Sequence, residues 1–190
     1  MEVDELFKRT KPDIVLHAAA YTTGSKDVVE APWKHVTTNT IINALVLEAC
    51  NTHKVEHTVF FSCSVPYQSK DTPQKETDWN PGDEIPKSYF GVGNMKVFTE
   101  RLCEFYSRLG GKFTAIRNSN IYGPWDKTDF DKCHMLPAQI RKVCEATNTL
   151  EVWGDGVSTK RDVLYVSDVV GLVDAVINNQ KKNYELFKWK

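Results

Sequence analysis

The sequence lacks several features that mark common functional classes. No run of about 18 apolar residues is present. The first residues, MEVDE, are acidic, whereas a secretion signal begins with a basic stretch that is followed by an apolar one. We therefore expect no membrane span and no secretion signal, which favours a cytoplasmic location. Neither sign of charge is in excess, because the sequence contains 24 basic and 25 acidic residues. Without a basic field, we expect neither a nucleic-acid partner nor a membrane partner.

Paired cysteines are also lacking. The five cysteines are odd in number, widely spaced and never form a C-x-x-C pair, so we expect reduced thiols. The D-x-x-D-x-D pattern over residues 126–131 lacks the glycine and spacing of a calcium loop, and Cys133-His134 has no second ligand pair. We therefore expect no metal site.

What the sequence does contain is enough apolar content, 41% of 190 residues, to bury a core. Short apolar runs alternate with segments of helical periodicity, which predicts an α/β fold with a parallel sheet and right-handed crossovers. The expected strands are residues 13–20, 57–64, 113–121 and 150–153, and a segment over residues 162–166 leads into the last helix. The expected helices are Trp33–Cys50, Val92–Leu109, Met135–Cys144 and Ser167–Asn178, with Ser167 as an N-cap of the last.

Six segments, taken in order, resemble one family. They are PDIVLHAAA (12–20), TTNTIINALVLEAC (37–50), FFSCSVP (60–66), NMKVFTE (94–100), RNSNIYGP (117–124) and VWGDGVSTKRDVLYVSD (152–168). Their spacing is similar to that of the extended short-chain dehydrogenases/reductases, the NAD-dependent epimerase/dehydratase family, which act on nucleotide sugars. CHMLPAQIRKV after NIYGPWDKTDF resembles the GDP-fucose synthase branch.

The resemblance implies a partial Rossmann-type, doubly wound parallel sheet with the start of a small substrate-binding lobe. Residues 1–125 would form a partial dinucleotide-binding domain. Residues 126–190 would form a partial substrate-binding region, with a returning strand and helix. The family's first strand and its G-x-x-G-x-x-G cofactor loop would lie upstream of Met1, and the rest of the sugar lobe beyond Lys190. Without that first strand, residues 13–20 would be an open sheet edge, which predicts self-association.

The family's catalytic serine and lysine match Ser62 and Lys96. The family tyrosine, four residues before the lysine, falls on Val92, which has no proton to transfer, and Tyr89 lies about two helical turns from Lys96. Alternatively, Lys96 and Glu100 form an exposed ion pair one helical turn apart.

GDP-fucose synthases also use a cysteine and a histidine to epimerise the sugar. The histidine matches His134, which could instead be a capping or core residue. The cysteine position falls on Ser64. Cys63 lies one residue early, on the opposite face of a strand, and we expect it to be a small buried hydrophobe.

The remaining residues match positions that bind the cofactor or the substrate in the family. A cofactor, NADP or NAD, would lie against ten residues: Ala18, Ala19, Ala20, Asn39, Lys96, Asn118, Ser119, Asn120, Ile121 and His134. The alanines could equally reflect tight sheet packing. A nucleotide-sugar partner, with a GDP-sugar favoured, would be held by Lys142, Trp153 and Arg161, although each could be an ordinary surface or packing residue.

Two functions are therefore expected from the resemblance. The first is an NAD(P)-dependent nucleotide-sugar epimerase/reductase that converts GDP-4-keto-6-deoxymannose to GDP-fucose. The alternative is a non-catalytic truncated homologue that binds a nucleotide sugar or serves as a dimerisation partner. In either case the family implies a homodimer through the helices Trp33–Cys50 and Val92–Leu109.

Overall fold

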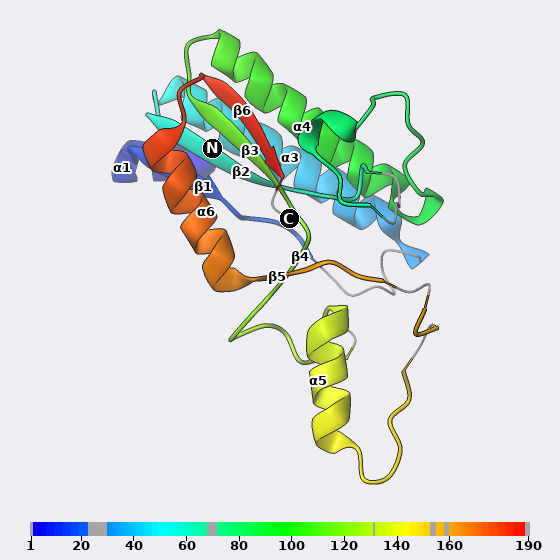
Figure 1. Ribbon diagram of the computed structural model, residues 1–190. Coiled ribbons are helices and arrows are strands. Elements are labelled where there is room, and N and C mark those ends of the chain that lie inside the picture. Colours follow the sequence, from blue (N-terminus) through cyan, green and yellow to red (C-terminus); the bar gives the residue numbers. More distant parts are fainter. Residues whose placement is uncertain are drawn as a thin grey trace.

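A four-stranded, fully parallel sheet forms the centre of the molecule. The computed structural model describes residues 2–22, 30–67, 72–130, 132–152, 155–157 and 160–188. The strand order is β1-β2-β3-β6 (Figure 1), and each adjacent pair is parallel. The bounds are β1 Ile14–His17, β2 His57–Cys63, β3 Phe113–Asn118 and β6 Tyr184–Lys188. The predicted α/β class with a parallel sheet is confirmed.

Helices cover both faces of this sheet, which is the doubly wound arrangement (Figure 1). On one face lie α1 (Glu2–Thr10), α3 (Pro32–Thr52) and α4 (Phe90–Arg108), and on the other lies α6 (Val166–Asn179). Two short 3₁₀ helices, η1 (Glu76–Asp78) and η2 (Lys87–Tyr89), precede α4.

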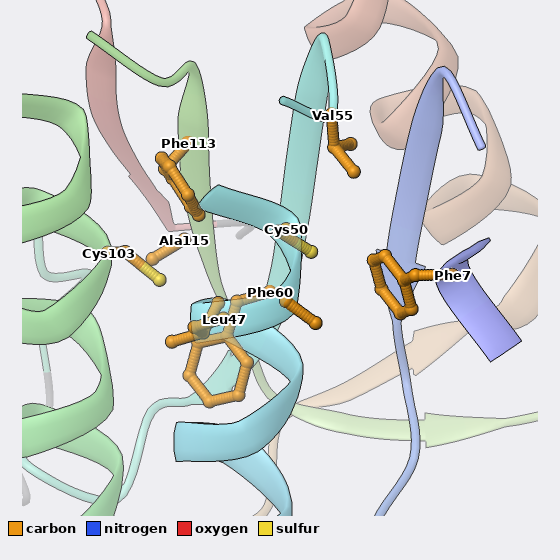
Figure 2. Close-up of a cluster of buried hydrophobic side chains, with 9 residues drawn as sticks. Phe7, Leu47, Cys50, Val55, Phe60, Cys103, Phe113 and Ala115 are labelled. Carbon is orange, nitrogen blue, oxygen red and sulfur yellow. The ribbon is translucent and has the colours of Figure 1, made fainter. Parts of the chain in front are cut away.

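The larger hydrophobic cluster fills the space between the sheet and the first three helices (Figure 2). Phe60 of β2 and Phe113 of β3 pack there with Leu47 of α3, Cys103 of α4 and Phe7 of α1. Alternate strand residues point to opposite faces. Val59 and Ile116 therefore contribute to a second cluster beneath α6.

A separate two-stranded parallel sheet, β4 (Asn120–Tyr122) and β5 (Val163–Tyr165), leads away from the main sheet. Helix α5 (Met135–Glu145) lies beyond it, apart from the main body (Figure 1). The strand predicted over 113–121 is therefore divided, because the chain leaves the main sheet at Ser119 and pairs instead with β5.

Several predicted boundaries are wrong. Ala18–Ala20 lie beyond the end of β1, and residues 150–152 form no strand. Ser167 is not the N-cap of α6, since that position is Tyr165. Neither α1 nor β6 was predicted from the sequence, and β6 pairs with β3 in the main sheet.

Strand β1 is an edge of the sheet, as predicted, because it pairs only with β2 among the described residues. Its side chains Ile14 and Leu16 are 41% and 50% exposed. An edge strand with exposed apolar side chains is a template for further pairing.

Candidate active site

The candidate site lies at the carboxyl edge of the main sheet, where β2 and β3 end together. Ser62 is in register with Arg117, and Cys63 with Asn118. Because the strands are parallel, their final residues meet at one edge, which is where ligands bind in open α/β sheets. Lys96 of α4 reaches the same edge by donating a 2.7 Å hydrogen bond from Nζ to the Phe61 carbonyl.

Lys96 is held in a partly buried position. Its Nζ lies 4.7 Å from the centre of the Phe60 ring, within the range of a cation–π contact. Burial lowers the pKa of Lys96, while the Cys63 sulfur, when ionised, and the Glu100 carboxylate oppose that shift. The alternative of an exposed Lys96–Glu100 ion pair is wrong, because Glu100 is buried and its carboxylate binds other groups.

Those groups are Arg117 and Ser62. Arg117 donates from Nε to Glu100 Oε1 at 2.9 Å and from Nη2 to Oε2 at 2.6 Å, a bidentate pair with both side chains buried. Ser62 donates its hydroxyl to Glu100 Oε1. Burial alone would lower the pKa of Arg117, but its hydrogen bonds and charge attraction to Glu100 raise it. The ion pair therefore fixes the position of Ser62.

Two aromatic rings enclose the Arg117 guanidinium. Its Cζ lies 4.6 Å from the Trp79 ring centre and 5.0 Å from that of Tyr67, and Nη1 donates to the Tyr67 hydroxyl at 2.9 Å. Burial raises the pKa of Tyr67, against the influence of Arg117. This arrangement was not predicted from the sequence. The available signal was an arginine inside the apolar strand FTAIRN, which requires a buried anionic partner.

Cys63 and Ser64 follow Ser62 at the end of β2. Burial raises the pKa of Cys63, although nearby Lys96 lowers it in part. The thiol is therefore protonated at neutral pH, as suits a small hydrophobe. The backbone N–H of Ser64 donates to the Asn118 carbonyl at 3.0 Å, which keeps the ends of β2 and β3 together.

The segment after β1 is tied to α3. Ala18, Ala19 and Ala20 are exposed, so they are not part of tight sheet packing. The buried Asn39 accepts from the Tyr21 backbone N–H at 2.7 Å and donates to the Tyr21 carbonyl at 3.0 Å. Asn39 therefore positions the loop that carries the alanines.

The segment after β3 contains an unusual acceptor. Asn118 donates from Nδ2 to the Ser119 carbonyl at 3.0 Å, but its Oδ1 is buried without a hydrogen-bond partner. Asn120 donates to the Asp162 carbonyl at 3.0 Å, which joins the start of β4 to the segment before β5. Ile121 is partly buried within β4.

The residues predicted to hold the sugar nucleotide lie away from the main sheet. His134 is the exposed N-cap of α5, without a side-chain capping bond. Lys142, on the same helix, donates from Nζ to the Glu151 carbonyl at 3.1 Å. Arg161 is exposed, and Trp153 lies outside the described residues.

Position 92 offers no acid or base. Val92 is partly buried in α4, one turn before Lys96. Tyr89 precedes the helix as its N-cap and is 42% exposed. The phenol of Tyr89 is thus separated from Lys96 by nearly two turns of helix.

No described helix combines the length and apolar character needed to cross a bilayer. In the same part of the chain, no group of three or more His, Cys, Asp or Glu side chains could hold a metal ion.

Comparison with protein families gives a match over almost the whole chain. The profile of the NAD dependent epimerase/dehydratase family matches residues 1–187. Among curated proteins, the chain is 29% identical over 182 residues to a GDP-L-colitose synthase of Yersinia pseudotuberculosis, covering 92% of this chain and 58% of that protein. It is 31% identical over 174 residues to a GDP-L-fucose synthase of Sinorhizobium fredii, covering 88% of this chain and 54% of that protein.

Solved structures give the same fold. A GDP-L-fucose synthetase from Naegleria fowleri bound to NADP has a TM-score of 0.84 at 20% identity, covering 97% of this chain and 62% of that one. A UDP-glucose 4-epimerase from Thermotoga maritima with UDP-glucose has a TM-score of 0.79 at 25% identity, covering 99% of this chain and 58% of that one. The chain thus spans between a half and two thirds of the length of these proteins.

Proposed function

Because the chain belongs to the NAD dependent epimerase/dehydratase family, we propose that it carries part of an NAD(P)-dependent nucleotide-sugar epimerase/reductase of the GDP-fucose synthase type. The proposed reaction converts GDP-4-keto-6-deoxymannose to GDP-fucose. Relatives named for GDP-L-fucose and GDP-L-colitose synthesis support the choice of a GDP-sugar. Others are named for dTDP-sugars and UDP-sugars, so the nucleotide is part of the proposal.

One observation carries this proposal. Ser62, Lys96 and the segment starting at Asn118 lie at the same carboxyl edge of adjacent parallel elements. The edge combines the Ser62 hydroxyl, the partly buried Lys96 cation and the unpaired Asn118 amide oxygen, and such groups suit a carbonyl and a nicotinamide ribose.

Ser62 is proposed to polarise the keto oxygen. Its hydroxyl donates to Glu100 in this structure, but a hydroxyl hydrogen rotates about its C–O bond and can turn to a substrate oxygen. Lys96 is proposed to hold the ribose, since it already bridges the end of β2 to α4. The roles of His134 and Ser64 in epimerisation belong to the same proposal.

The residues present fit a nicotinamide cofactor, NADP or NAD. The orphaned Asn118 Oδ1 is a buried acceptor suited to a carboxamide N–H. The exposed Ala18–Ala20 offer a surface without bulky side chains, held in place by Asn39. A bound nicotinamide cofactor supplies the hydride, while the residues of this chain bind and orient the reactants.

The nucleotide sugar is proposed to lie between this edge and α5. Lys142 and Arg161 would pair with the diphosphate through charge-assisted hydrogen bonds, together with Trp153. Lys142 is partly buried and donates to a backbone carbonyl, whereas Arg161 is exposed.

The decisive experiment is to measure NADPH oxidation with GDP-4-keto-6-deoxymannose for the unmodified chain and for Val92→Tyr. General acid catalysis contributes about 10²- to 10⁴-fold, so Val92→Tyr should raise the rate by that order. Val92→Phe is the matched control, because it adds the ring without the proton. Equal rates for Val92→Tyr and Val92→Phe would contradict the proposed chemistry.

The alternative function is a non-catalytic nucleotide-sugar binder or dimerisation partner. Val92 favours it, because the chain then lacks the family acid. A homodimer through α3 and α4 is supported by exposed apolar side chains on both helices, namely Trp33, Ile41, Leu45, Phe98 and Phe105. Exposed apolar surface of this kind marks association sites.

The homodimer has its own test. Ile41→Asp should shift the sedimenting species from dimer to monomer, because it places a charge in the proposed interface. Val143→Asp, at an equally exposed valine of α5, is the control. A dimer that survives Ile41→Asp would contradict the role of this face.

A further inference from the structure

His17 is a buried polar residue at the carboxyl end of β1. It is the last residue of that strand, and only 4% of it is exposed. The next three residues, Ala18–Ala20, are those proposed above to lie against the cofactor. In the parallel register His17 is opposite Phe60 of β2, so both side chains point to the face that α3 and α4 cover. His17 therefore adjoins the proposed cofactor surface and faces the helices.

A directional chain of hydrogen bonds joins His17 to α4. Its Nε2 lies 2.8 Å from Asn43 Oδ1, and Asn43 Nδ2 donates to Thr99 Oγ1 at 3.1 Å. Thr99 in turn donates to the Met95 carbonyl at 2.9 Å. Burial lowers the pKa of His17, so the imidazole is neutral at pH 7, and an acceptor at Asn43 Oδ1 requires its proton on Nε2. The chain thus ends on the backbone immediately before Lys96.

The Phe60 ring makes a second connection between His17 and Lys96. The ring centres of His17 and Phe60 are 5.7 Å apart, and Lys96 Nζ lies 4.7 Å from the centre of the same Phe60 ring. Phe60 is 1% exposed, and a side chain packed this closely cannot move without its neighbours. His17 therefore supports the ring on which the ammonium group rests.

Loss of the His17 donor would disturb this arrangement. Asn43 is 3% exposed, so its Oδ1 would become a buried acceptor without a partner. Such a group is unfavourable, and the amide would turn towards another donor. Thr99 and Met95, which flank Lys96 on α4, would then lose their contacts with Asn43 Nδ2.

We propose that His17 is a positioning residue for Lys96, which it holds at the end of β2 through Asn43 and the Phe60 ring. This inference rests on the proposed function, in which Lys96 holds the nicotinamide ribose. His17 itself does not touch the ribose in this arrangement. Because Ala18–Ala20 follow His17 directly, the same side chain also fixes the proposed cofactor surface relative to the Lys96 ammonium group.

The test follows the Lys96 side chain by NMR in protein labelled with ¹³C-lysine, and Lys96→Met assigns its signal. An aromatic ring shifts the signals of protons over its face upfield, so the εCH₂ protons of Lys96 should resonate upfield of those of exposed lysines. His17→Phe keeps a ring beside Phe60 but removes the donor. The Lys96 signal should then move about half or more of the way to the exposed lysines, because the hydrogen-bonded chain is broken. His17→Gln keeps an N–H donor and should retain most of the upfield shift.

His57→Phe is the matched control. His57 is an equally buried histidine, 2% exposed, but it is the first residue of β2 and bonds to Thr114 and Gln180. The same substitution therefore removes a buried donor at the opposite end of the strand from Phe61, whose carbonyl binds Lys96. His57→Phe should destabilise the protein and leave the Lys96 signal in place. A purely structural His17 would behave in the same way.

A second variant covers the case in which His17→Phe does not fold. His17→Phe/Asn43→Leu removes donor and acceptor together, so no buried polar group is left unpaired. It also lacks the hydrogen-bonded chain, and it should show the same movement of the Lys96 signal as His17→Phe.

Three results would overturn the inference: an unchanged Lys96 signal in these variants, an equal loss of the upfield shift in His17→Gln, or a Lys96 signal without an upfield shift in the unmodified chain. NADPH affinity, measured by fluorescence, is a separate readout. It should fall in His17→Phe, as in Lys96→Met, but not in His57→Phe. Absence of NADPH binding to the unmodified chain would contradict the proposed function, while the NMR comparison would still decide whether His17 positions Lys96.

Discussion

Arg117 and Glu100 form a bidentate ion pair beneath the candidate site, with both side chains excluded from water. The pair joins β3 to α4, and through the Ser62 hydroxyl it also holds the end of β2. One carboxylate therefore joins three elements, β2, α4 and β3.

Replacement of one partner of this pair should destabilise the fold strongly. Arg117→Met leaves Glu100 buried without its partner, and we expect the free energy of unfolding to fall by about 3–5 kcal/mol. The Arg117→Met/Glu100→Met double variant should recover part of this loss, because no uncompensated charge then remains. Urea denaturation measures both, with the exposed Arg101→Met as control. A loss below about 1 kcal/mol in Arg117→Met would show that the pair is not buried in solution.

A tyrosine at position 92 should titrate below the ordinary range. Lys96 lies one helical turn away, and a nearby cation favours the phenolate. We expect the difference in ultraviolet absorbance between Val92→Tyr and the unmodified chain to titrate below pH 10. In the double variant Val92→Tyr/Lys96→Met, the midpoint of this titration should move to higher pH. An unchanged midpoint would exclude an electrostatic role for Lys96.

Two buried histidines should make the protein less stable in mild acid. Burial lowers the pKa of His17, which is bonded to Asn43, and of His57, which is bonded to Thr114 and Gln180. Below about pH 6.5 the unfolded chain therefore binds more protons than the folded one, so stability falls as the pH falls through this range.

The measurement is urea denaturation at a series of pH values between about 7.5 and 5. His17→Gln/His57→Gln should flatten the profile above pH 5, because the glutamine side chain keeps a hydrogen bond but does not titrate. An equally steep decline in this double variant would assign the pH dependence to other groups.

The edge strand β1 should promote association. Leu16 is half exposed on a strand that pairs only with β2 among the described residues, so Leu16→Lys should reduce concentration-dependent species larger than a dimer. Val143→Lys on α5 is the control. Sedimentation velocity separates the outcomes, and a stable monomer at all concentrations in the unmodified chain would contradict the prediction.

Much of the fold could be predicted because its signals are local. The apolar runs at β2 and β3 and the periodic helices α3 and α4 were located to within a few residues. The features that were not predicted depend on partners distant in the sequence. Strand β6 forms because it pairs with β3, and the strand predicted over 113–121 is interrupted at Ser119 because β4 pairs with β5. A window of sequence contains no information on such pairing.

The sequence by itself determined the alternation of strands and helices, the absence of a phenol at position 92 and the order of the family-like segments. Only the tertiary structure decided which charges meet. Glu100 could have paired with Lys96 one turn away, but it binds Arg117 from β3 instead. Burial explains this outcome, since the bidentate guanidinium compensates a desolvated carboxylate better than a single ammonium on a flexible chain.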